Sequence, residues 1–346
     1  MRAFYLHKDI APSELPSTLS SDVPEPKAAA GSNEVIVDVH SAAFNFFDIL
    51  AVQGKYQVKT PHPYVPGVEM AGIISKDSPI PEGCDFVPGK TRVFGAAQGA
   101  YGEKTKADYW QLMEVPEGIS LEQAAGLFIT WPTSYAALKF RADVQPDEWV
   151  LVHAGAGGVG ICAIQIAKAM GAKVIATAGS DDKLRVCKEH GGADFAINYR
   201  DKDWQAQVKK ITEGHGVDVV YDPVGMIVPS LKVIAWNGRI IVVGFAAGTI
   251  EKIPANLILL KNVAVTGVHW GAYVRNEPDK IGETWEALLE MFKTKQVVPT
   301  VFDHIYEGLE SVPAGLKDLA DRKTWGKAVV RIRADPQFPP KGKHKL

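Results

Sequence analysis

The chain has 346 residues, a hydrophobic fraction of 46%, a charged fraction of 23% and a formal net charge of −2 at pH 7. This length exceeds what one hydrophobic core usually fills, so we expect two domains. The near-neutral charge gives no electrostatic reason to expect a nucleic-acid or membrane-surface partner.

The cysteines and the N-terminus indicate a reducing compartment. The three cysteines are Cys84, Cys162 and Cys187, and their odd number and wide spacing exclude a disulfide framework and a four-cysteine zinc lobe. The N-terminus lacks the apolar stretch of a secretion signal, and no run of 18 apolar residues occurs. We therefore expect a cytoplasmic protein with no membrane partner.

The chain shows two sequence patterns, one in its first third and a different one in its middle part. Residues 1 to about 128 contain short β-type runs separated by Gly and Pro, which predicts an all-β region. From about 130 to 270, buried strand-like runs alternate with helical patterns, which predicts a doubly wound parallel sheet. The expected fold class is α/β.

A glycine-rich turn follows the apolar run 149–152 and precedes a helical pattern and a buried strand at 173–178. Gly155, Gly157 and Gly160 have the Gly-x-Gly-x-x-Gly spacing of a dinucleotide-binding turn. The pyrophosphate is expected at the helix N-terminus. The residues assigned to it are Ala156, Gly157, Gly158 and Val159. A tight strand-to-helix connection without a ligand is the alternative interpretation.

The end of the second strand bears on the choice of cofactor. It runs out at Gly179 and Ser180, without the acid that would bind a ribose 2′-hydroxyl, and Lys183 and Arg185 lie just beyond. Room and positive charge for a 2′-phosphate favour NADP(H). Alternatively, the two aspartates after Ser180 cap the next helix, and the basic side chains are only solvated.

Four further segments carry a family likeness: 43–48, 54–56, 63–72 and 100–103. With the glycine turn, in this order and spacing, they resemble the medium-chain dehydrogenase/reductase superfamily, and within it the zinc-free quinone oxidoreductases related to zeta-crystallin. The resemblance implies a GroES-like catalytic domain formed by residues 1–128 and 271–346. It also implies a Rossmann NADP-binding domain formed by residues 129–270.

The same comparison predicts that no metal is bound. Zinc-dependent relatives carry Gly-His-Glu where this chain has Gly67, Val68 and Glu69, and a cysteine at or near the position of Asn45. A tetrahedral catalytic zinc needs imidazole and thiolate ligands, and a valine cannot replace them.

The resemblance places Asn45 near the nicotinamide ribose and Tyr56 toward the substrate, where a phenol could donate a proton. The alternatives are a turn residue after a strand for Asn45 and a half-buried aromatic residue for Tyr56. We expect Asp48 to orient loop backbone. Some relatives place an arginine near the substrate at about the position of Trp270. In this chain the substrate pocket is expected to be aromatic instead, with Tyr64, Trp270 and Tyr273.

The resemblance also adds cofactor residues. Relatives use the position of Thr133 near the nicotinamide and hold a 2′-phosphate with residues that match Lys183 and Tyr199. Gly244 and Phe245 would approach the ribose-nicotinamide side. Arg322 matches a further phosphate-binding arginine of some relatives, and a solvated helix end is the equal alternative.

These expectations together predict an NADPH-dependent quinone oxidoreductase. Reduction of a carbon–carbon double bond in an enone or enoyl thioester is the alternative, and a non-catalytic RNA-binding or crystallin-like role is a remote one. A homodimer is expected through the strand at 263–267, which would lie at a sheet edge. The basic tail at 341–345 is interpreted as a frayed end.

Overall fold

The computed structural model describes residues 1–246, 248 and 250–339. The chain forms two compact units, one of Met1–Ile129 with Val301–Leu346 and one of Thr130–Thr300. We describe each unit by itself.

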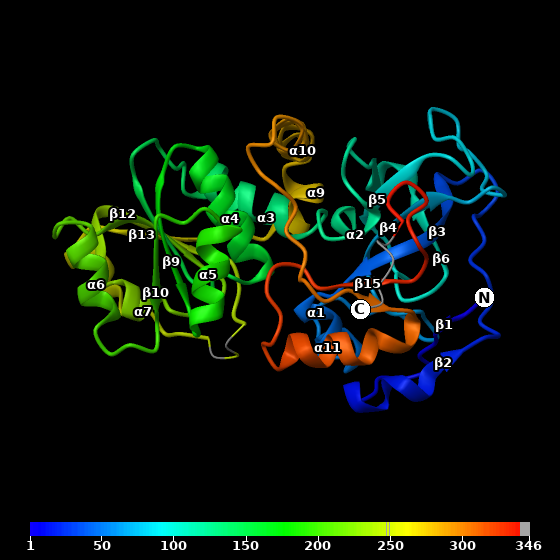
Figure 1. Ribbon diagram of the computed structural model, residues 1–346, viewed down its shortest axis with the longest axis horizontal. Coiled ribbons are helices and arrows are strands. Elements are labelled where there is room, and N and C mark those ends of the chain that lie inside the picture. The colour runs from blue at the N-terminus through cyan, green and yellow to red at the C-terminus, as the bar shows by residue number, and fades with distance from the viewer. Residues whose placement is uncertain (247, 249, 340–346) are drawn as a thin grey trace, which may run out of the picture. The chain divides into compact units, whose positions relative to one another are not determined.

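The first unit is built on a seven-stranded sheet with the order β14-β15-β3-β4-β5-β7, in which β6 also pairs with β3. The strands of this sheet are β3 (Glu34–Ala43), β4 (Glu69–Ile74), β5 (Arg92–Ala96), β6 (Lys104–Asp108), β7 (Leu112–Glu114), β14 (Tyr306–Glu307) and β15 (Val329–Arg331). A small second sheet pairs β1 (Ala3–Phe4) with β2 (Leu19–Ser20). Because β15 pairs antiparallel with β3, both ends of the chain build this unit (Figure 1).

Three α-helices complete the described part of the first unit: α1 (Phe46–Val52), α2 (Leu121–Ala124) and α11 (Val312–Ala320). The expectation of an all-β first region is therefore wrong at α1 and α2. Helix α1 forms because Asp48, at its third position, accepts the N–H of Asn45 at 2.8 Å, which supplies one half of a capping box. Helices as short as α1, with seven residues, and α2, with four, leave little periodic signal in a sequence.

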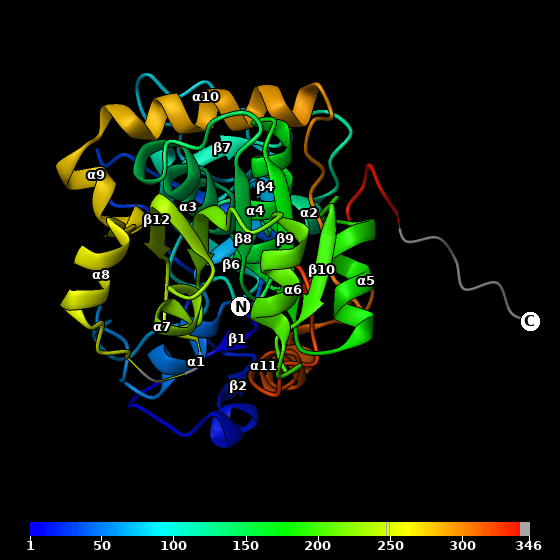
Figure 2. The ribbon, with the colours of Figure 1, turned by 90° about the vertical axis from the view of Figure 1, so that its left-hand side faces the viewer.

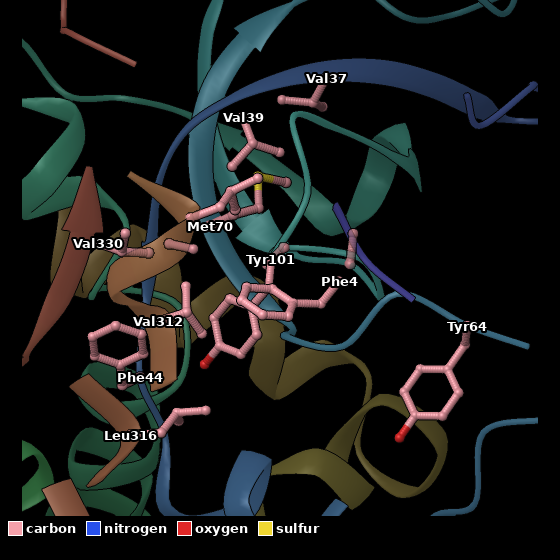
Figure 3. Packing of buried hydrophobic residues seen from close by; sticks show 14 of the residues in the cluster. Phe4, Val37, Val39, Phe44, Tyr64, Met70, Tyr101, Val312, Leu316 and Val330 are labelled. Carbon is pink, nitrogen blue, oxygen red and sulfur yellow. The ribbon is translucent and has the colours of Figure 1, made fainter. Parts of the chain in front are cut away.

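The core of the first unit lies where β3, β4 and β15 meet the aromatic rings of Phe44 and Tyr101, whose centroids are 5.9 Å apart. Figure 3 shows these rings beside Met70 and the α11 side chains Val312 and Leu316. Helix α11 comes this close because Gly315 has no side chain. A Cβ there would lie 2.1 Å from the Phe44 ring.

The second unit contains a six-stranded sheet with the order β10-β9-β8-β11-β12-β13, in which every pair is parallel. Its strands are β8 (Trp149–Val152), β9 (Lys173–Ala178), β10 (Phe195–Asn198), β11 (Val217–Asp222), β12 (Ile234–Val242) and β13 (Ala264–Gly267). This order is that of a dinucleotide-binding Rossmann sheet, with its switch point between β8 and β11. The predicted doubly wound sheet is therefore present.

Helices cover both faces of this sheet, with α4 and α5 on one face and α6 and α7 on the other (Figures 1 and 2). The α-helices of this unit are α3 (Thr130–Ala136), α4 (Gly158–Ala169), α5 (Asp181–Glu189), α6 (Trp204–Ile211), α7 (Ile227–Ser230), α8 (Ala255–Lys261), α9 (Tyr273–Asn276) and α10 (Asp279–Lys293). Since all strands are parallel, their carboxyl ends meet at one edge of the sheet, where ligands bind in folds of this kind.

The observed division of the chain differs from the expected one in residues 271–300, which belong to the second unit. The apolar face of α10 explains this. Phe292 packs edge-on against Trp131 of α3, with the ring centroids 4.9 Å apart. Further along, Thr300 accepts a hydrogen bond from Gln165 of α4 at 2.9 Å. These contacts attach the segment to α3 and α4.

Within the described residues, no helix is long and apolar enough to cross a membrane. Helix α10 has 15 residues, whereas a spanning helix needs about 20. The predicted basic tail at 341–345 lies outside the described residues.

Candidate functional site

Asn45 ends the chain segment after β3 and precedes α1, and its side chain is 6% exposed. It does not cap the helix. Its Nδ2 donates to Glu69 Oε2 at 2.9 Å, and its Oδ1 accepts from Lys327 Nζ at 2.8 Å. Asn45 has the extended backbone of a helix N-cap residue and is not in a turn, and its side chain belongs to a buried polar cluster.

Glu69 and Lys327 form an ion pair within this cluster. Lys327 Nζ lies 2.7 Å from Glu69 Oε2, and the side chains are 5% and 0% exposed for Lys327 and Glu69, respectively. The second carboxylate oxygen, Oε1, accepts the N–H of Ile129 at 2.9 Å. Both oxygens of the carboxylate therefore have donors, which offsets much of the cost of burying the charge. Sequence reasoning missed Lys327, which is 258 positions from Glu69.

Asp48 is a second buried carboxyl group beside Asn45. Its Oδ2 accepts two hydrogen bonds at 2.8 Å, one from the Asn45 N–H and one from the Tyr101 hydroxyl. Burial raises the pKa of Asp48 to about 7, although both hydrogen bonds act in the opposite direction. Burial and the neighbouring Asp48 carboxyl raise the pKa of Tyr101 well above its usual value. Asp48 orients the loop backbone, as the sequence predicts.

Tyr56 is half-buried and stacks on Phe47 of α1, with ring centroids 5.2 Å apart and an interplanar angle of 27°. Burial, followed by the negative charge of Asp48, raises the pKa of Tyr56, so its phenol stays protonated at neutral pH. Tyr64 is different. It is 9% exposed and packs in the core of the first unit, and its hydroxyl is 3.4 Å from the Ala51 carbonyl.

The glycine turn connects β8 to α4, as predicted. Gly157 is the N-cap of α4 without a side-chain cap, and the Ile161 N–H donates to the Gly157 carbonyl at 2.9 Å. The N–H groups of residues 158–160 precede that bond, and such groups at a helix N-terminus bind phosphate. A Cβ on Gly160 would lie 2.3 Å from the backbone of the turn. The geometry needs glycine there.

Tyr199 and Arg200 meet Gly179 at the carboxyl end of β9. A Cβ on Gly179 would lie 2.5 Å from the Tyr199 hydroxyl and 3.3 Å from Arg200 Nε. Ser180 is the N-cap residue of α5, without a side-chain cap hydrogen bond, and Asp182, the second residue of the helix, pairs with Arg185. Arg185 is therefore engaged on its own helix, and Arg200 is a basic group that sequence reasoning did not assign. Its signal in the sequence was its position directly after Tyr199, which was assigned to the 2′-phosphate.

The remaining residues predicted to bind the cofactor lie in different elements, and one of them lies in the first unit. Gly244 and Phe245 follow β12 at the carboxyl edge of the sheet, and Phe245 is 43% exposed. Thr133 lies in α3. Arg322 belongs to the first unit, after α11, and has a positive φ of 57°.

Trp270 and Tyr273 lie together in the second unit, with ring centroids 5.2 Å apart. Tyr273 also stacks on Phe140, at 6.4 Å and 28°. Burial raises the pKa of Tyr273. These two predicted pocket residues therefore form one aromatic stack, whereas Tyr64 is a core residue of the first unit.

His153 is a buried residue at the end of β8 that sequence reasoning left without a role. Its two ring nitrogens lie 2.9 Å from Thr177 Oγ1 and 2.7 Å from Ser230 Oγ. Burial lowers its pKa to about 4, so the ring is neutral at physiological pH. It joins β8, β9 and α7 beneath the carboxyl edge of the sheet.

The chain resembles known proteins over nearly its whole length. Family models described as "Zinc-binding dehydrogenase" and "Alcohol dehydrogenase GroES-like domain" match residues 158–294 and 31–117. "Quinone oxidoreductase-like protein 2" of Mus musculus is 36% identical over 327 residues, which are 92% of this chain and 89% of that protein.

Two solved structures extend this likeness. The Escherichia coli quinone oxidoreductase complexed with NADPH has a TM-score of 0.82 at 29% identity, covering 96% of this chain and 100% of that one. The CurK enoyl reductase has a TM-score of 0.80 at 25% identity, covering 95% and 98%.

The raised pKa of Asp48 predicts a pH-dependent stability. Between about pH 7 and pH 4 the folded protein binds a proton at Asp48 that the unfolded chain, with an Asp pKa near 3.9, does not bind. This group therefore favours the folded state increasingly as the pH falls through that window, and the contribution is lost as the pH rises toward 7. Its slope is at most about 1.4 kcal/mol per pH unit.

Asp48→Asn removes this contribution. Urea unfolding at a series of pH values should show the free-energy difference between wild type and Asp48→Asn growing in favour of wild type from pH 7 to pH 5. Asp77→Asn, at an exposed loop position, is the control. A difference that is constant with pH would show that Asp48 does not titrate in this range.

Proposed function

Since the chain belongs to the quinone oxidoreductase family of the medium-chain dehydrogenase/reductase superfamily, we propose that it transfers hydride from NADPH to a quinone without zinc. The observation that carries the proposal is the end of β9, where a tyrosine hydroxyl and a guanidinium flank Gly179. Neither Gly179 nor Ser180 at the strand end is an acid, and Asp181 and Asp182 belong to the first turn of α5. A 2′-phosphate needs positive charge and donors at that place.

NADPH, when bound, supplies the hydride. The N–H groups at the start of α4 would bind the pyrophosphate, and Lys183, Tyr199 and Arg200 would bind the 2′-phosphate. Gly244 and Phe245 would approach the ribose-nicotinamide side, with Thr133 near the nicotinamide. Arg322 remains a candidate for a further phosphate contact. Apart from Thr133 and Arg322, the residues assigned here follow strands at the carboxyl edge of the parallel sheet, where ligands bind in folds of this kind.

The residues around Glu69 do not fit a catalytic zinc. The neighbouring positions offer the amide of Asn45 and the side chain of Val68 in place of thiolate and imidazole. The carboxylate of Glu69 already has an ammonium group at 2.7 Å, which a cation would have to displace. Among the described residues, no group of three or more His, Cys, Asp or Glu side chains could hold a metal ion.

Without a Lewis acid, the substrate oxygen must be polarised by hydrogen bonds. The phenol of Tyr56, kept protonated by its raised pKa, can donate such a bond. A quinone accepts one hydride and one proton to become a hydroquinone. An enone or enoyl thioester accepts the hydride at one carbon and the proton after enolate formation. This second reaction is the alternative, favoured by the likeness to the CurK enoyl reductase.

Replacing the basic residues near Gly179 should weaken NADPH use selectively. Each of Lys183→Ala and Arg200→Ala should lower kcat/KM for NADPH by about 10- to 100-fold, the value of one charge-assisted hydrogen bond, and affect NADH by less than about threefold. Steady-state kinetics with both cofactors measure this. Lys188→Ala, exposed on the same helix, is the control. Equal losses with both cofactors would contradict the assigned 2′-phosphate site.

A panel of quinones, enones and enoyl thioesters separates the two reactions. We expect NADPH oxidation with at least one quinone, and Tyr56→Phe should lower quinone reduction by at most about tenfold, the effect of losing one hydrogen bond to the quinone oxygen. If the protein is an enone reductase, Tyr56→Phe should lower that activity by about 10²- to 10⁴-fold, because the enolate loses its proton donor. Tyr109→Phe is the control. Absence of turnover with every quinone would exclude the proposed substrate class.

We also propose a homodimer. Strand β13 is the last strand of its sheet order. Two exposed apolar side chains lie on the elements beside it: Leu259 of α8, which precedes β13, is 76% exposed, and Trp236 of the neighbouring β12 is 69% exposed. An exposed apolar edge favours pairing with a second copy. The molar mass in light scattering tests this, and a monomer mass would contradict it.

A further inference from the structure

We propose that Lys327 is a positioning residue for the predicted catalytic Asn45, and that its ammonium group determines which way the Asn45 carboxamide faces. The inference rests on the proposed function, because Asn45 matters here as the residue expected beside the nicotinamide ribose. The buried ring of Asn45, Glu69 and Lys327 supports it.

The Asn45 carboxamide is held by two contacts of opposite kind. Its Oδ1 accepts from Lys327 Nζ at 2.8 Å, and its Nδ2 donates to Glu69 Oε2 at 2.9 Å. The same Glu69 oxygen accepts from Lys327 Nζ at 2.7 Å, which closes the ring. A flipped amide would place its NH₂ group against the ammonium and its oxygen against the carboxylate, so both contacts would become repulsive. The ring therefore selects one orientation, with the second Nδ2 hydrogen as the donor left for a ligand.

Burial makes this selection strong. The Lys327 and Glu69 side chains are 5% and 0% exposed, so water and salt screen their charges little. Lys327 Nζ also lies 3.4 Å from the carbonyl of Phe44, the residue before Asn45. The ammonium group thus contacts the backbone beside Asn45 as well as its side chain.

Glu69 and Lys327 also contact the two backbone segments that connect the first unit to the second. Ile129, the last residue before the second unit, donates its N–H to Glu69 Oε1 at 2.9 Å. Where the chain returns, the Phe302 N–H donates to the Lys327 carbonyl at 2.8 Å, and Val301 forms a parallel bridge with Lys327. The ring is therefore tied to the backbone on both of its charged sides.

Gly126 provides the space for the Lys327 side chain. A Cβ on Gly126 would lie 2.9 Å from Lys327 Cβ and 3.0 Å from Cγ. Any side chain at position 126 would have to displace the aliphatic stem that carries the ammonium group to Asn45. The path of the lysine is thus defined by backbone packing as well as by its charge.

Kinetics provide the first test. With NADPH and the best acceptor of the panel, Lys327→Met should lower kcat by about 10- to 100-fold, the usual effect of removing a group that orients a reacting one. The KM for NADPH should change by less than about threefold, since Lys327 is not among the residues proposed to bind the pyrophosphate or the 2′-phosphate. Lys327→Arg keeps the charge and should restore part of kcat. Lys188→Met, exposed on α5, is the control.

Loss of the ammonium alone can unfold the first unit, because Glu69 would become a buried carboxylate without its counter-charge. The double variant Lys327→Met with Glu69→Gln removes both charges and keeps side chains of similar size. If this double variant is folded, any loss of activity comes from the lost positioning of Asn45 and not from unfolding. Circular dichroism and thermal melting establish which variants are folded.

A second readout does not depend on turnover. The chain has seven asparagines, so an NMR spectrum of protein labelled with ¹⁵N-asparagine contains only seven side-chain NH₂ groups. The two signals of the Asn45 NH₂ group are identified because they are missing from the spectrum of Asn45→Ser. The two Asn45 amide protons should be widely separated in wild type and Lys327→Arg, because only one faces the carboxylate. They should move toward the values of exposed amides in the double variant.

The outcomes separate the inference from the function it rests on. A folded double variant with unchanged kcat and unchanged Asn45 amide signals would overturn the role of Lys327. If wild type reduces no acceptor, the proposed function fails, and the Asn45 amide signals alone decide whether Lys327 positions this side chain.

Discussion

The contact between Lys327 Nζ and Glu69 Oε2, 2.7 Å long and shielded from water, is the interaction on which the site of the first unit depends. An isolated carboxylate at the position of Glu69 would cost several kcal/mol to bury, and the neighbouring ammonium offsets that cost. The pair then orders what surrounds it, since Asn45 bonds to both partners. The charge of the Glu69 carboxylate is thus compensated by an ammonium group of the chain itself.

A second constraint acts in the other unit. Parallel strands bring the residues that follow β8, β9, β10 and β12 to one edge of the sheet. The N–H groups at the start of α4 therefore lie at the same edge as the hydroxyl of Tyr199 and the guanidinium of Arg200, which come from a distant segment of the chain. Small residues at the turn let backbone approach a ligand closely. The neutral His153 beneath this edge links the strands without adding charge near the proposed phosphate site.

The features that depend on local sequence could be predicted. Glycine spacing and an apolar run before it indicated the turn between β8 and α4. The alternation of strand-like runs with helical patterns indicated the parallel sheet. Family likeness indicated the superfamily, which the relatives and solved structures confirm. The lack of an acid at Gly179 and Ser180, directly at the end of β9, was also visible in the sequence, because it depends on one strand end.

The features that depend on distant contacts could not be predicted. Lys327 meets Glu69 across 258 positions, and nothing near either residue in the sequence indicates the pair. Residues 271–300 joined the second unit because Phe292 and Thr300 contact α3 and α4, which their own periodicity does not reveal. Helix α1 was missed because its start depends on one carboxylate, Asp48, rather than on a repeating pattern.

The most direct test of the account is the activity of metal-free protein. The wild-type chain is treated with a chelator, its zinc content is measured by mass spectrometry, and NADPH oxidation with the best quinone is followed in the same preparation. If Lys327 and Asn45 replace the metal, turnover per chain stays unchanged when zinc falls far below one ion per chain. Activity that disappears with the metal and returns on adding Zn²⁺ would contradict the account.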